Sequence, residues 1–166
     1  MSGVDSPQRR WPVVVFFLTA LMVVTADQLT KFWIRTFPEG QTIFQAGFLQ
    51  IIRNQNTGAA FGLFQGQSLV FTIIDFIGIA IILVLVLRFS HRFRFLERMV
   101  ARIALALVMG GTAGNLIDRL NPNLEGVTDF ISAGIWPSFN VADSAITVGV
   151  ILLAYSLIFL TRTEKG

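Results

Sequence analysis

Five aspartates are the side chains that could carry out chemistry in this apolar sequence; they are Asp27, Asp75, Asp118, Asp129 and Asp143. Two carboxylates held close together share one proton near neutral pH, so that one can act as a general base and the other as a general acid. The chain has no Cys, and its one His, His91, lies in a basic segment away from these aspartates. A thiolate nucleophile and a Ser–His–Asp triad are therefore excluded, and hydrolysis by this chain would depend on carboxylates.

Two of the aspartates stand at spacings that also suit the end of a helix. Asp27 and Lys31 are four residues apart, which on a helix places them on one face as an ion pair. Asn140 lies three residues before Asp143, and this spacing resembles a capping box at a helix N-terminus. A purely structural role explains each pattern as well as a place in an active site does, and both interpretations stay open at this point.

The segment GGTAGNLIDR combines small residues with polar ones. Gly110 and Gly114 form a small-xxx-small face, which is typical of tight packing between membrane helices. Asp118 is placed unfavourably at the end of a helix, because the helix dipole favours cations there. Arg119 offsets this charge, and we expect Asn115, Asp118 and Arg119 to form a network that orients other groups.

Three further polar positions give weaker signals. Asn56 and Gly58 belong to NTGAAF, a turn-forming segment that is either a plain loop or a place where the chain offers an amide to a ligand or a carboxylate. Asp129 in VTDF is by itself a single loop carboxylate, which is usually solvated. Asp75 interrupts an apolar stretch without an evident role, and only Lys31 is suggested as its partner.

The elements that must position these residues are membrane helices. Of the 166 residues, 54% are hydrophobic and only 14% are charged, and the mean hydropathy is +0.68. This composition excludes a disordered chain and differs from that of a soluble domain, in which about 25% of residues are charged. Four apolar stretches have the length of about 20 residues that a bilayer requires; they are 12–33, 69–87, 100–117 and 141–160. We predict an all-α integral membrane protein in which residues 1–166 form a single domain.

Basic residues set the expected orientation, because Lys and Arg gather on the cytoplasmic side of membrane proteins. Nine of them lie before the first stretch, around the second connection or after the fourth stretch: Arg9, Arg10, Arg88, Arg92, Arg94, Arg98, Arg102, Arg162 and Lys165. Only four lie on the other side: Lys31, Arg35, Arg53 and Arg119. Both termini are therefore expected in the cytoplasm, with the loops 34–68 and 118–140 outside it.

The two outer loops are expected to differ in structure. Residues 48–53 are rich in strand formers and are surrounded by glycines, so that loop 34–68 should form a small extracytoplasmic, β-rich insert on the membrane surface. Loop 118–140 contains Gly126 and Pro137 and is predicted to be an irregular, aromatic cap. Loops of this length between bundle helices are usually functional, which places the expected activity outside the cytoplasm.

Five motifs, taken in order, resemble the bacterial lipoprotein signal peptidase (signal peptidase II) family. They are DQLTK at 27–31, NTGAAF at 56–61, GGTAGNLIDR at 110–119, VTDF at 127–130 and FNVAD at 139–143. Each motif is weak alone, but the five together, at suitable places among four spans, are specific. None of these positions departs from the family pattern, whereas Asp75 and the first ten residues match nothing in it.

The resemblance implies an aspartyl endopeptidase at the membrane surface, which removes the signal peptide of a prolipoprotein by cutting before a diacylglyceryl-modified Cys. It also implies that Asp129 and Asp143 are the catalytic pair. The residues implied to orient this pair and the substrate are Asp27, Lys31, Asn56, Gly58, Asn115, Asp118, Arg119 and Asn140. Neither a metal ion nor another cofactor is expected.

The same resemblance implies a location and partners. The protein is expected to be a monomer in the bacterial inner membrane, with its active site on the outer side. Its expected partners are lipidated prolipoproteins and membrane lipid, and not nucleic acid. The residues alone leave two other function classes open: a small transporter lined by carboxylates, and a metal-dependent lipid or phosphate enzyme with Asp118, Asp129 and Asp143 as ligands.

Overall fold

The computed structural model describes residues 7–58, 66–90 and 92–158. Residues 59–61, which complete the predicted turn segment, lie outside the described residues, as does His91. Within the described residues, four long helices and a four-stranded sheet form the fold.

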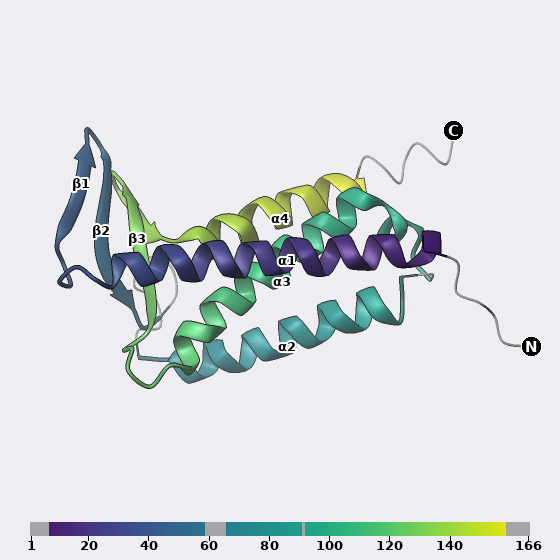
Figure 1. Ribbon diagram of the computed structural model, residues 1–166, viewed down its shortest axis with the longest axis horizontal. Coiled ribbons are helices and arrows are strands. Elements are labelled where there is room, and N and C mark those ends of the chain that lie inside the picture. Colours follow the sequence, from purple (N-terminus) through teal and green to yellow (C-terminus); the bar gives the residue numbers. More distant parts are fainter. Residues whose placement is uncertain (1–6, 59–65, 91, 159–166) are drawn as a thin grey trace, which may run out of the picture.

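The helices run along the long axis of the molecule (Figure 1); they are α1 (Pro7–Ile34), α2 (Ser68–Leu87), α3 (Met99–Leu120) and α4 (Val141–Ile158), with a short 3₁₀ helix, η2 (Arg94–Glu97), between α2 and α3. All four long helices are long and apolar enough to cross a membrane. In a bilayer such a segment folds as a helix, because a helix satisfies its backbone N–H and C=O groups internally. The prediction of four apolar helices is confirmed, although α3 continues beyond residue 117 and carries Asp118 and Arg119 in its last turn.

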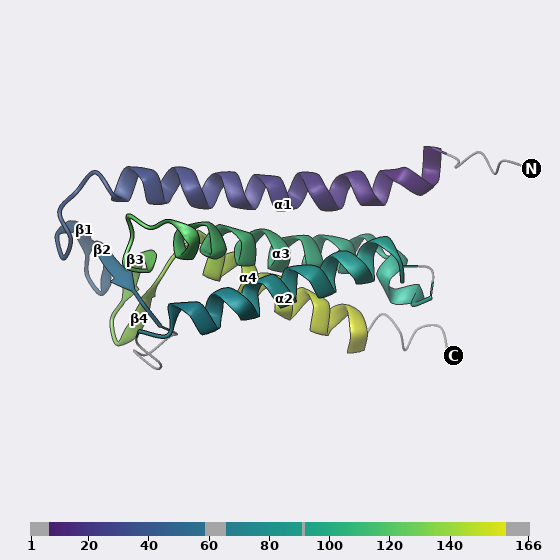
Figure 2. The same cartoon turned by 90° about the horizontal axis from the view of Figure 1, so that it is seen from below.

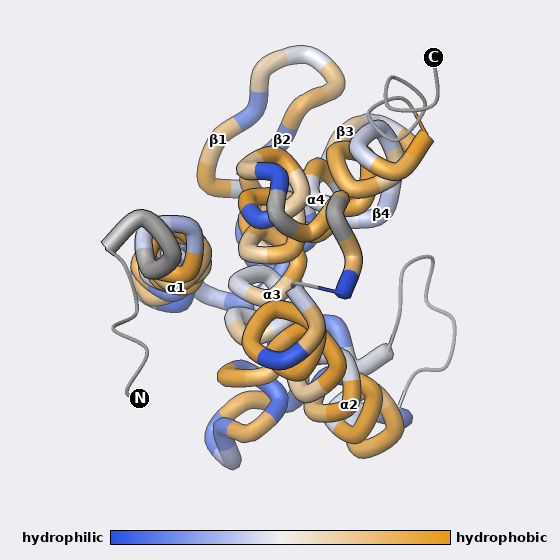
Figure 3. Tube along the Cα trace, turned by 90° about the vertical axis from the view of Figure 1, so that its right-hand side faces the viewer, coloured by the Kyte–Doolittle hydropathy of each residue, from blue (hydrophilic) through white to orange (hydrophobic). Residues whose placement is uncertain are grey.

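Helix α3 lies at the centre of the bundle. In its apolar stretch 61% of the residues are buried inside the protein, against 17% in each of the other three helices, and α1, α2 and α4 are arranged around it (Figures 2 and 3). A Cβ atom on Gly110 would lie 2.8 Å from the carbonyl oxygen of Ala20, and one on Gly114 would lie 2.6 Å from Oδ2 of Asp27. Both glycines therefore permit the close contact of α1 with α3, as predicted.

An antiparallel sheet lies across one end of the bundle (Figure 1). Its strands, in sheet order, are β1 (Thr42–Ala46), β2 (Leu49–Asn56), β3 (Val127–Ala133) and β4 (Trp136–Phe139). The two hairpins turn at Gly47 and Gly134, whose φ angles of 61° and 59° favour glycine. Because β2 pairs with β3, the two long loops are joined in a single sheet.

The prediction that loop 118–140 is an irregular cap is wrong, since about half of this loop forms the two strands β3 and β4. The sequence of β3, VTDFISA, suits a strand, but so short a strand is stable only where another strand supplies a pairing edge. Strand β2 supplies that edge, with Asn54 opposite Asp129 and Asn56 opposite Val127. This register brings polar residues of the two loops together.

All four long helices have one end at the sheet, where α1 and α3 end and α2 and α4 begin (Figure 1). The start of α1, the end of α4 and the connection between α2 and α3 lie at the opposite end of the bundle. Residues in the last turns of α1 and α3 and in the first turn of α4 are therefore brought next to β2 and β3.

Candidate active site

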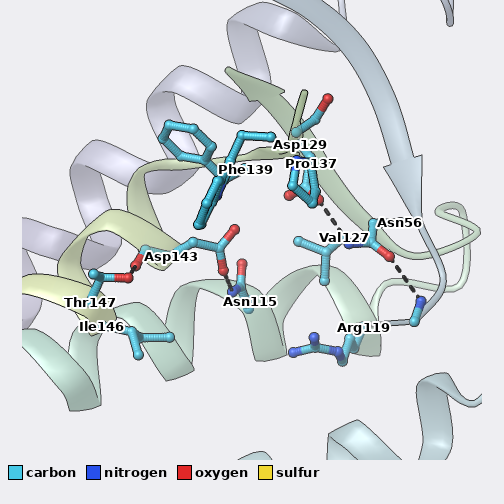
Figure 4. A pocket seen from close by; sticks show the side chains of 13 residues that line it. Asn56, Asn115, Arg119, Val127, Asp129, Pro137, Phe139, Asp143, Ile146 and Thr147 are labelled. Atoms are coloured by element: carbon cyan, nitrogen blue, oxygen red, sulfur yellow. Dashed lines mark hydrogen bonds between the residues drawn. The ribbon is translucent and has the colours of Figure 1, made fainter. Parts of the chain in front are cut away.

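A pocket of about 470 Å³ opens where α3, α4 and the sheet meet (Figure 4). Asp129, from β3, and Asp143, from the first turn of α4, both line it. The other lining residues are Asn56, Gly58, Asn115, Arg119, Val127, Trp136, Pro137, Ser138, Phe139, Ile146 and Thr147. The remaining predicted site residues are buried behind the pocket wall: Asp27, Lys31, Asp118 and Asn140.

Asp143 is held at the start of α4. Its Oδ1 accepts a hydrogen bond of 2.8 Å from Nδ2 of Asn115, and its Oδ2 accepts one of 3.2 Å from the backbone N–H of Asn140. In return, Oδ1 of Asn140 accepts a hydrogen bond of 2.9 Å from the backbone N–H of Asp143. This reciprocal pair is a capping box, so the structural interpretation of the spacing is confirmed. The same carboxylate also lines the pocket (Figure 4).

Asp129 is supported by two side-chain amides. Its Oδ1 accepts a hydrogen bond of 2.8 Å from Nδ2 of Asn140, and its Oδ2 accepts one of 2.9 Å from Nδ2 of Asn56. The amide of Asn56 is itself fixed, because its Oδ1 accepts a hydrogen bond of 3.0 Å from the backbone N–H of Gly58. Of the two interpretations of this turn, the one in which it offers an amide to a carboxylate is therefore confirmed.

The surroundings of Asp129 favour its protonated form. Only 3% of this residue is exposed, and burial raises the pKa of a carboxyl because the charged form loses its water. The negative charge of Asp143 raises the pKa further, while the amides of Asn56 and Asn140 lower it in part, and together they bring the pKa of Asp129 to about 7. Two carboxyl groups that line one pocket can thus hold one proton between them near neutral pH.

A group of charged residues lies behind the pocket; it consists of the buried Asp27, Lys31 and Asp118 and the partly exposed Arg35, and is called the charge cluster below. Nζ of Lys31 is 2.8 Å from Oδ2 of Asp27 and 3.4 Å from Oδ2 of Asp118. Oδ1 of Asp118 is 2.6 Å from Nη2 of Arg35. The predicted ion pair between Asp27 and Lys31 is confirmed, but it lies fully buried inside the protein rather than where a helix meets solvent.

The charge cluster anchors the two elements that carry the pocket carboxylates. Oδ1 of Asp27 accepts a hydrogen bond of 2.9 Å from the backbone N–H of Ala142 in α4. Oδ2 of Asp118 accepts one of 2.9 Å from the backbone N–H of Thr128 in β3. Each contact therefore fixes the residue directly before one of the two pocket carboxylates.

Asn115 connects the charge cluster to the pocket. Its Oδ1 accepts hydrogen bonds from Nζ of Lys31 at 2.9 Å and from Nδ2 of Asn140 at 3.1 Å. Because its oxygen faces these two donors, its Nδ2 is turned toward Asp143. The buried ammonium group thus sets the orientation of an amide that holds a pocket carboxylate.

Arg119 has partners other than those predicted. Its Nη1 donates a hydrogen bond of 2.6 Å to Oδ2 of Asp75, and its guanidinium carbon lies 5.6 Å from the ring centroid of Phe71, both on α2. The predicted network of this arginine with its neighbours on α3 is wrong, as is Lys31 as the partner of Asp75. Successive helix residues differ in direction by about 100°, so Asp118 faces α1 and β3 while Arg119 faces α2.

Three polar residues in the hydrogen-bond network of the charge cluster were not predicted: Gln28, Arg35 and Thr128. Ser138 and Thr147, which line the pocket, were not predicted either. Nε2 of Gln28 donates to Oδ1 of Asp118 at 3.1 Å, and Nε of Arg35 donates to Oγ1 of Thr128 at 2.9 Å. Arg35 follows Lys31 by four residues, on the same face of α1, and this spacing could have revealed it. Gln28 and Thr128 gave no signal beyond their place inside two of the motifs.

Comparison with protein families agrees with the five motifs. A family model described as signal peptidase (SPase) II matches residues 19–159 of this chain. The matched range includes every residue that lines the pocket and every residue of the charge cluster.

Curated relatives and a solved structure are similar over nearly the whole chain. A lipoprotein signal peptidase from Moorella thermoacetica is 39% identical and covers 91% of this chain and 97% of its own length. A lipoprotein signal peptidase from Dehalococcoides mccartyi is 41% identical, covering 92% of this chain and 93% of its own. A solved structure described as a bacterial membrane enzyme superimposes with a TM-score of 0.79 at 32% identity, over 92% of each chain.

Proposed function

The chain belongs to the signal peptidase II family of proteases, and on that premise we propose that Asp129 and Asp143 are its catalytic carboxylates. The function follows from family membership: the chain is a membrane-spanning hydrolase that processes lipoprotein precursors. One observation supports the choice of residues. The two carboxylates line the same pocket, and the charge of Asp143 contributes to raising the pKa of Asp129 to about 7.

Asp129 carries the shared proton in this mechanism, because its pKa is raised to about 7. The ionised Asp143 removes a proton from a water molecule, whose oxygen attacks the scissile carbonyl carbon. Asp129 donates a hydrogen bond to the carbonyl oxygen, and a proton then passes to the amine nitrogen as the C–N bond breaks. Each proton transfer of this kind contributes about 10²–10⁴-fold to a rate.

The remaining site residues orient the pair or the substrate in this proposal. The three asparagines described above hold the two carboxylates through their amides. The charge cluster positions α4 and β3 from behind the pocket. Gly58 and Arg119 line the pocket and are placed to contact the peptide chain of a substrate.

The proposed substrate is a prolipoprotein in which a diacylglyceryl-modified Cys follows the scissile bond. Its acyl chains stay in the bilayer, because burial contributes about 0.8 kcal/mol for each CH₂ group. The pocket lies at the ends of α3 and α4, and the apolar faces of α2 and α4 are largely exposed in the protein. Membrane lipid and the acyl chains of the substrate are suited to cover these faces. We propose a monomer in which residues 1–166 form a single membrane domain.

We place the protein in the bacterial inner membrane with both termini in the cytoplasm and the sheet and pocket on the outer side. The support is the distribution of basic residues, because Lys and Arg favour the cytoplasmic side. The connection between α2 and α3, at the end of the bundle opposite the sheet, carries Arg88, Arg92, Arg94 and Arg98. In this orientation the pocket faces the side of the membrane to which the mature part of the precursor is exported.

The arrangement of the carboxylates favours a pair over a metal site. A metal-dependent enzyme of the kind considered above would gather Asp118, Asp129 and Asp143 around one ion. Asp118 instead pairs with Lys31 and Arg35, and it is not among the pocket-lining residues that the structure describes. Membership in a protease family likewise favours hydrolysis over transport.

Cleavage of a lipidated prolipoprotein by Asp129→Asn and Asp143→Asn enzyme tests this proposal. Asparagine is nearly isosteric with aspartate and remains polar both in β3, at position 129, and in the first turn of α4, at position 143, so both variants should fold. Each should lose a factor of about 10³ or more in rate, and the double variant should be little worse, because groups that act as one unit are not additive.

Glu125→Gln is the matched control, since Glu125 is an exposed acid in the loop just before β3. This variant should cleave at the wild-type rate, and a metal chelator should leave the wild type active. Robust cleavage by either Asn variant would contradict the proposed catalytic pair. Loss of wild-type activity in the presence of the chelator would contradict it as well.

A further inference from the structure

Helix α2 carries one ionisable residue, Asp75, about two turns from its end at the sheet. A carboxylate within an apolar span is costly, and such residues mark functional positions in membrane proteins. The family motifs do not include Asp75. Among the described residues, α2 contributes nothing directly to the pocket lining, so any influence of α2 on the site must pass through another helix.

Arg119 provides that connection, because it is both a pocket-lining residue and the partner of α2. Its Nη1 donates a hydrogen bond of 2.6 Å to Oδ2 of Asp75, and 12% of the arginine side chain and 14% of the aspartate side chain are exposed. The ring of Phe71 lies beneath the guanidinium, 5.6 Å from centroid to the guanidinium carbon. Phe71 and Asp75 are four residues apart and therefore share one face of α2.

We propose that Asp75, together with Phe71, is a positioning residue of α2 that fixes the guanidinium of Arg119 at the pocket wall for binding the peptide chain of the substrate. This inference rests on the proposed function, in which Arg119 contacts the substrate. A guanidinium has five N–H groups in a rigid plane. Asp75 takes one edge of this plane and Phe71 covers one face, and the other edges remain for carbonyl oxygens of the substrate.

Fixing the arginine in advance should affect substrate binding more than the chemical step. A long side chain that is already ordered loses less conformational entropy when a ligand binds. Arg119 makes no contact with Asp129 or Asp143 among the interactions that the structure describes. We therefore expect a change of Asp75 to appear mainly in KM rather than in kcat.

Steady-state cleavage of a lipidated prolipoprotein by Asp75→Asn enzyme tests the proposal, with thermal unfolding measured alongside. KM should rise about tenfold, the usual effect of losing one charge-assisted hydrogen bond, with a smaller change in kcat. Phe71→Leu keeps the ion pair and removes the aromatic face, so KM should rise about twofold to threefold. In an Arg119→Ala background, Asp75→Asn should add no further change in KM, because the aspartate acts through the arginine.

Phe76→Leu is the matched control for Phe71→Leu. Phe76 is the residue after Asp75, but it is 52% exposed and points away from the packed face of α2. Its replacement should leave KM at the wild-type value. An Asp75→Asn enzyme with unchanged KM, or one whose KM changes equally in the Arg119→Ala background, would overturn the positioning role.

Failure of this inference is distinguishable from failure of the proposed function. If the wild type cleaves the lipidated precursor and Asp143→Asn enzyme does not, the proposed function holds whatever Asp75 does. If Asp75→Asn enzyme does not fold, Phe71→Leu decides, because an unchanged KM in that variant overturns the inference. A wild type that does not cleave overturns the proposed function and the inference with it.

Discussion

Two pairs of aspartates lie at the sheet end of the same bundle, yet their surroundings differ. The aspartates of the charge cluster face an ammonium and a guanidinium group at 2.6–3.4 Å. The pocket carboxylates, Asp129 and Asp143, accept hydrogen bonds from side-chain amides, which carry no net charge. Both pairs are polar groups at the end of an apolar bundle, and of the four aspartates Asp129 and Asp143 line the pocket that the structure describes.

The difference shows how surroundings divide one residue type between two roles. A cation compensates the charge of a buried carboxylate and locks it in place, so the charge cluster is suited to hold α4 and β3. An amide orients a carboxylate but leaves its charge uncompensated, so two such groups together favour binding a proton. Asn115 touches both regions, and the geometry of the pocket pair therefore depends on the charge cluster.

Removing the buried ammonium group of Lys31 from the charge cluster should have the largest effect on stability. Lys31→Met keeps an unbranched side chain but leaves Asp27 and Asp118 buried without the ammonium group, and breaking a buried pair in this way costs about 3–5 kcal/mol. The free energy of unfolding in detergent should fall by that amount. Asp129→Asn is the contrast, because it leaves no charge uncompensated and replaces only one of the two oxygens that accept from Asn56 and Asn140, so stability should fall by less, about 1–3 kcal/mol. Equal stability of Lys31→Met and wild type would refute the anchoring role of the cluster.

The pocket pair should impose an alkaline limit on activity. The reactive form holds one proton, and the pKa of Asp129 is raised to about 7. As the pH rises through this value the second carboxyl of the free enzyme ionises, so kcat/KM should fall about tenfold for each further pH unit. A pH profile of kcat/KM from pH 5 to 9 measures this limit, and a profile that stays flat across that range contradicts the shared proton.

The raised pKa of Asp129 also predicts how the stability of the folded protein changes with pH. Above pH of about 4 an unfolded chain has released the proton of this carboxyl, whereas the folded protein keeps it until about pH 7. Protonation therefore stabilises the folded state at low pH, and this contribution is lost as the pH rises through about 7. The free energy of unfolding of the wild type, relative to that of Asp129→Asn, should therefore fall as the pH rises from about 4 to about 7.

The helices could be predicted from the sequence because an apolar stretch of about 20 residues that crosses a bilayer folds as a helix, which satisfies its own backbone hydrogen bonds. The sheet could be predicted only in part. Strand β2 contains the expected strand formers of residues 48–53, but β3 and β4 depend on pairing with an edge that another loop provides. Such pairing is non-local, and no spacing within loop 118–140 reveals it.

The contacts of the candidate site also differ in whether the sequence alone could predict them. The contact of Asp27 with Lys31 lies within one helix and follows from their spacing. The contact of Arg119 with Asp75 joins two helices, and it depends on the direction in which α3 presents each side chain. The assignment of Asp129 and Asp143 as a catalytic pair came from the resemblance of whole motifs rather than from any local spacing, and it stays a prediction until the variants are measured.

Replacing Asn140 with Ser should separate the capping role from the support of the pocket pair, and we expect its effect to be the smallest. Ser caps a helix as well as Asn does, so its oxygen can still accept from the N–H of Asp143, and stability should fall by about 1 kcal/mol or less. The shorter side chain cannot donate to Asp129 as Nδ2 of Asn140 does at 2.8 Å. That amide lowers the pKa of Asp129, so its loss should move the alkaline limit of kcat/KM to higher pH. The amide also orients the carboxyl group, and the loss of this orientation should reduce kcat about tenfold below that limit. Asn140→Ala is the control, because it loses the cap as well and should be less stable than Asn140→Ser at a similar kcat. If Asn140→Ser keeps the wild-type rate and the wild-type alkaline limit, Asn140 only caps its helix, and the amide support that distinguishes the pocket pair from the charge cluster has no part in the chemistry.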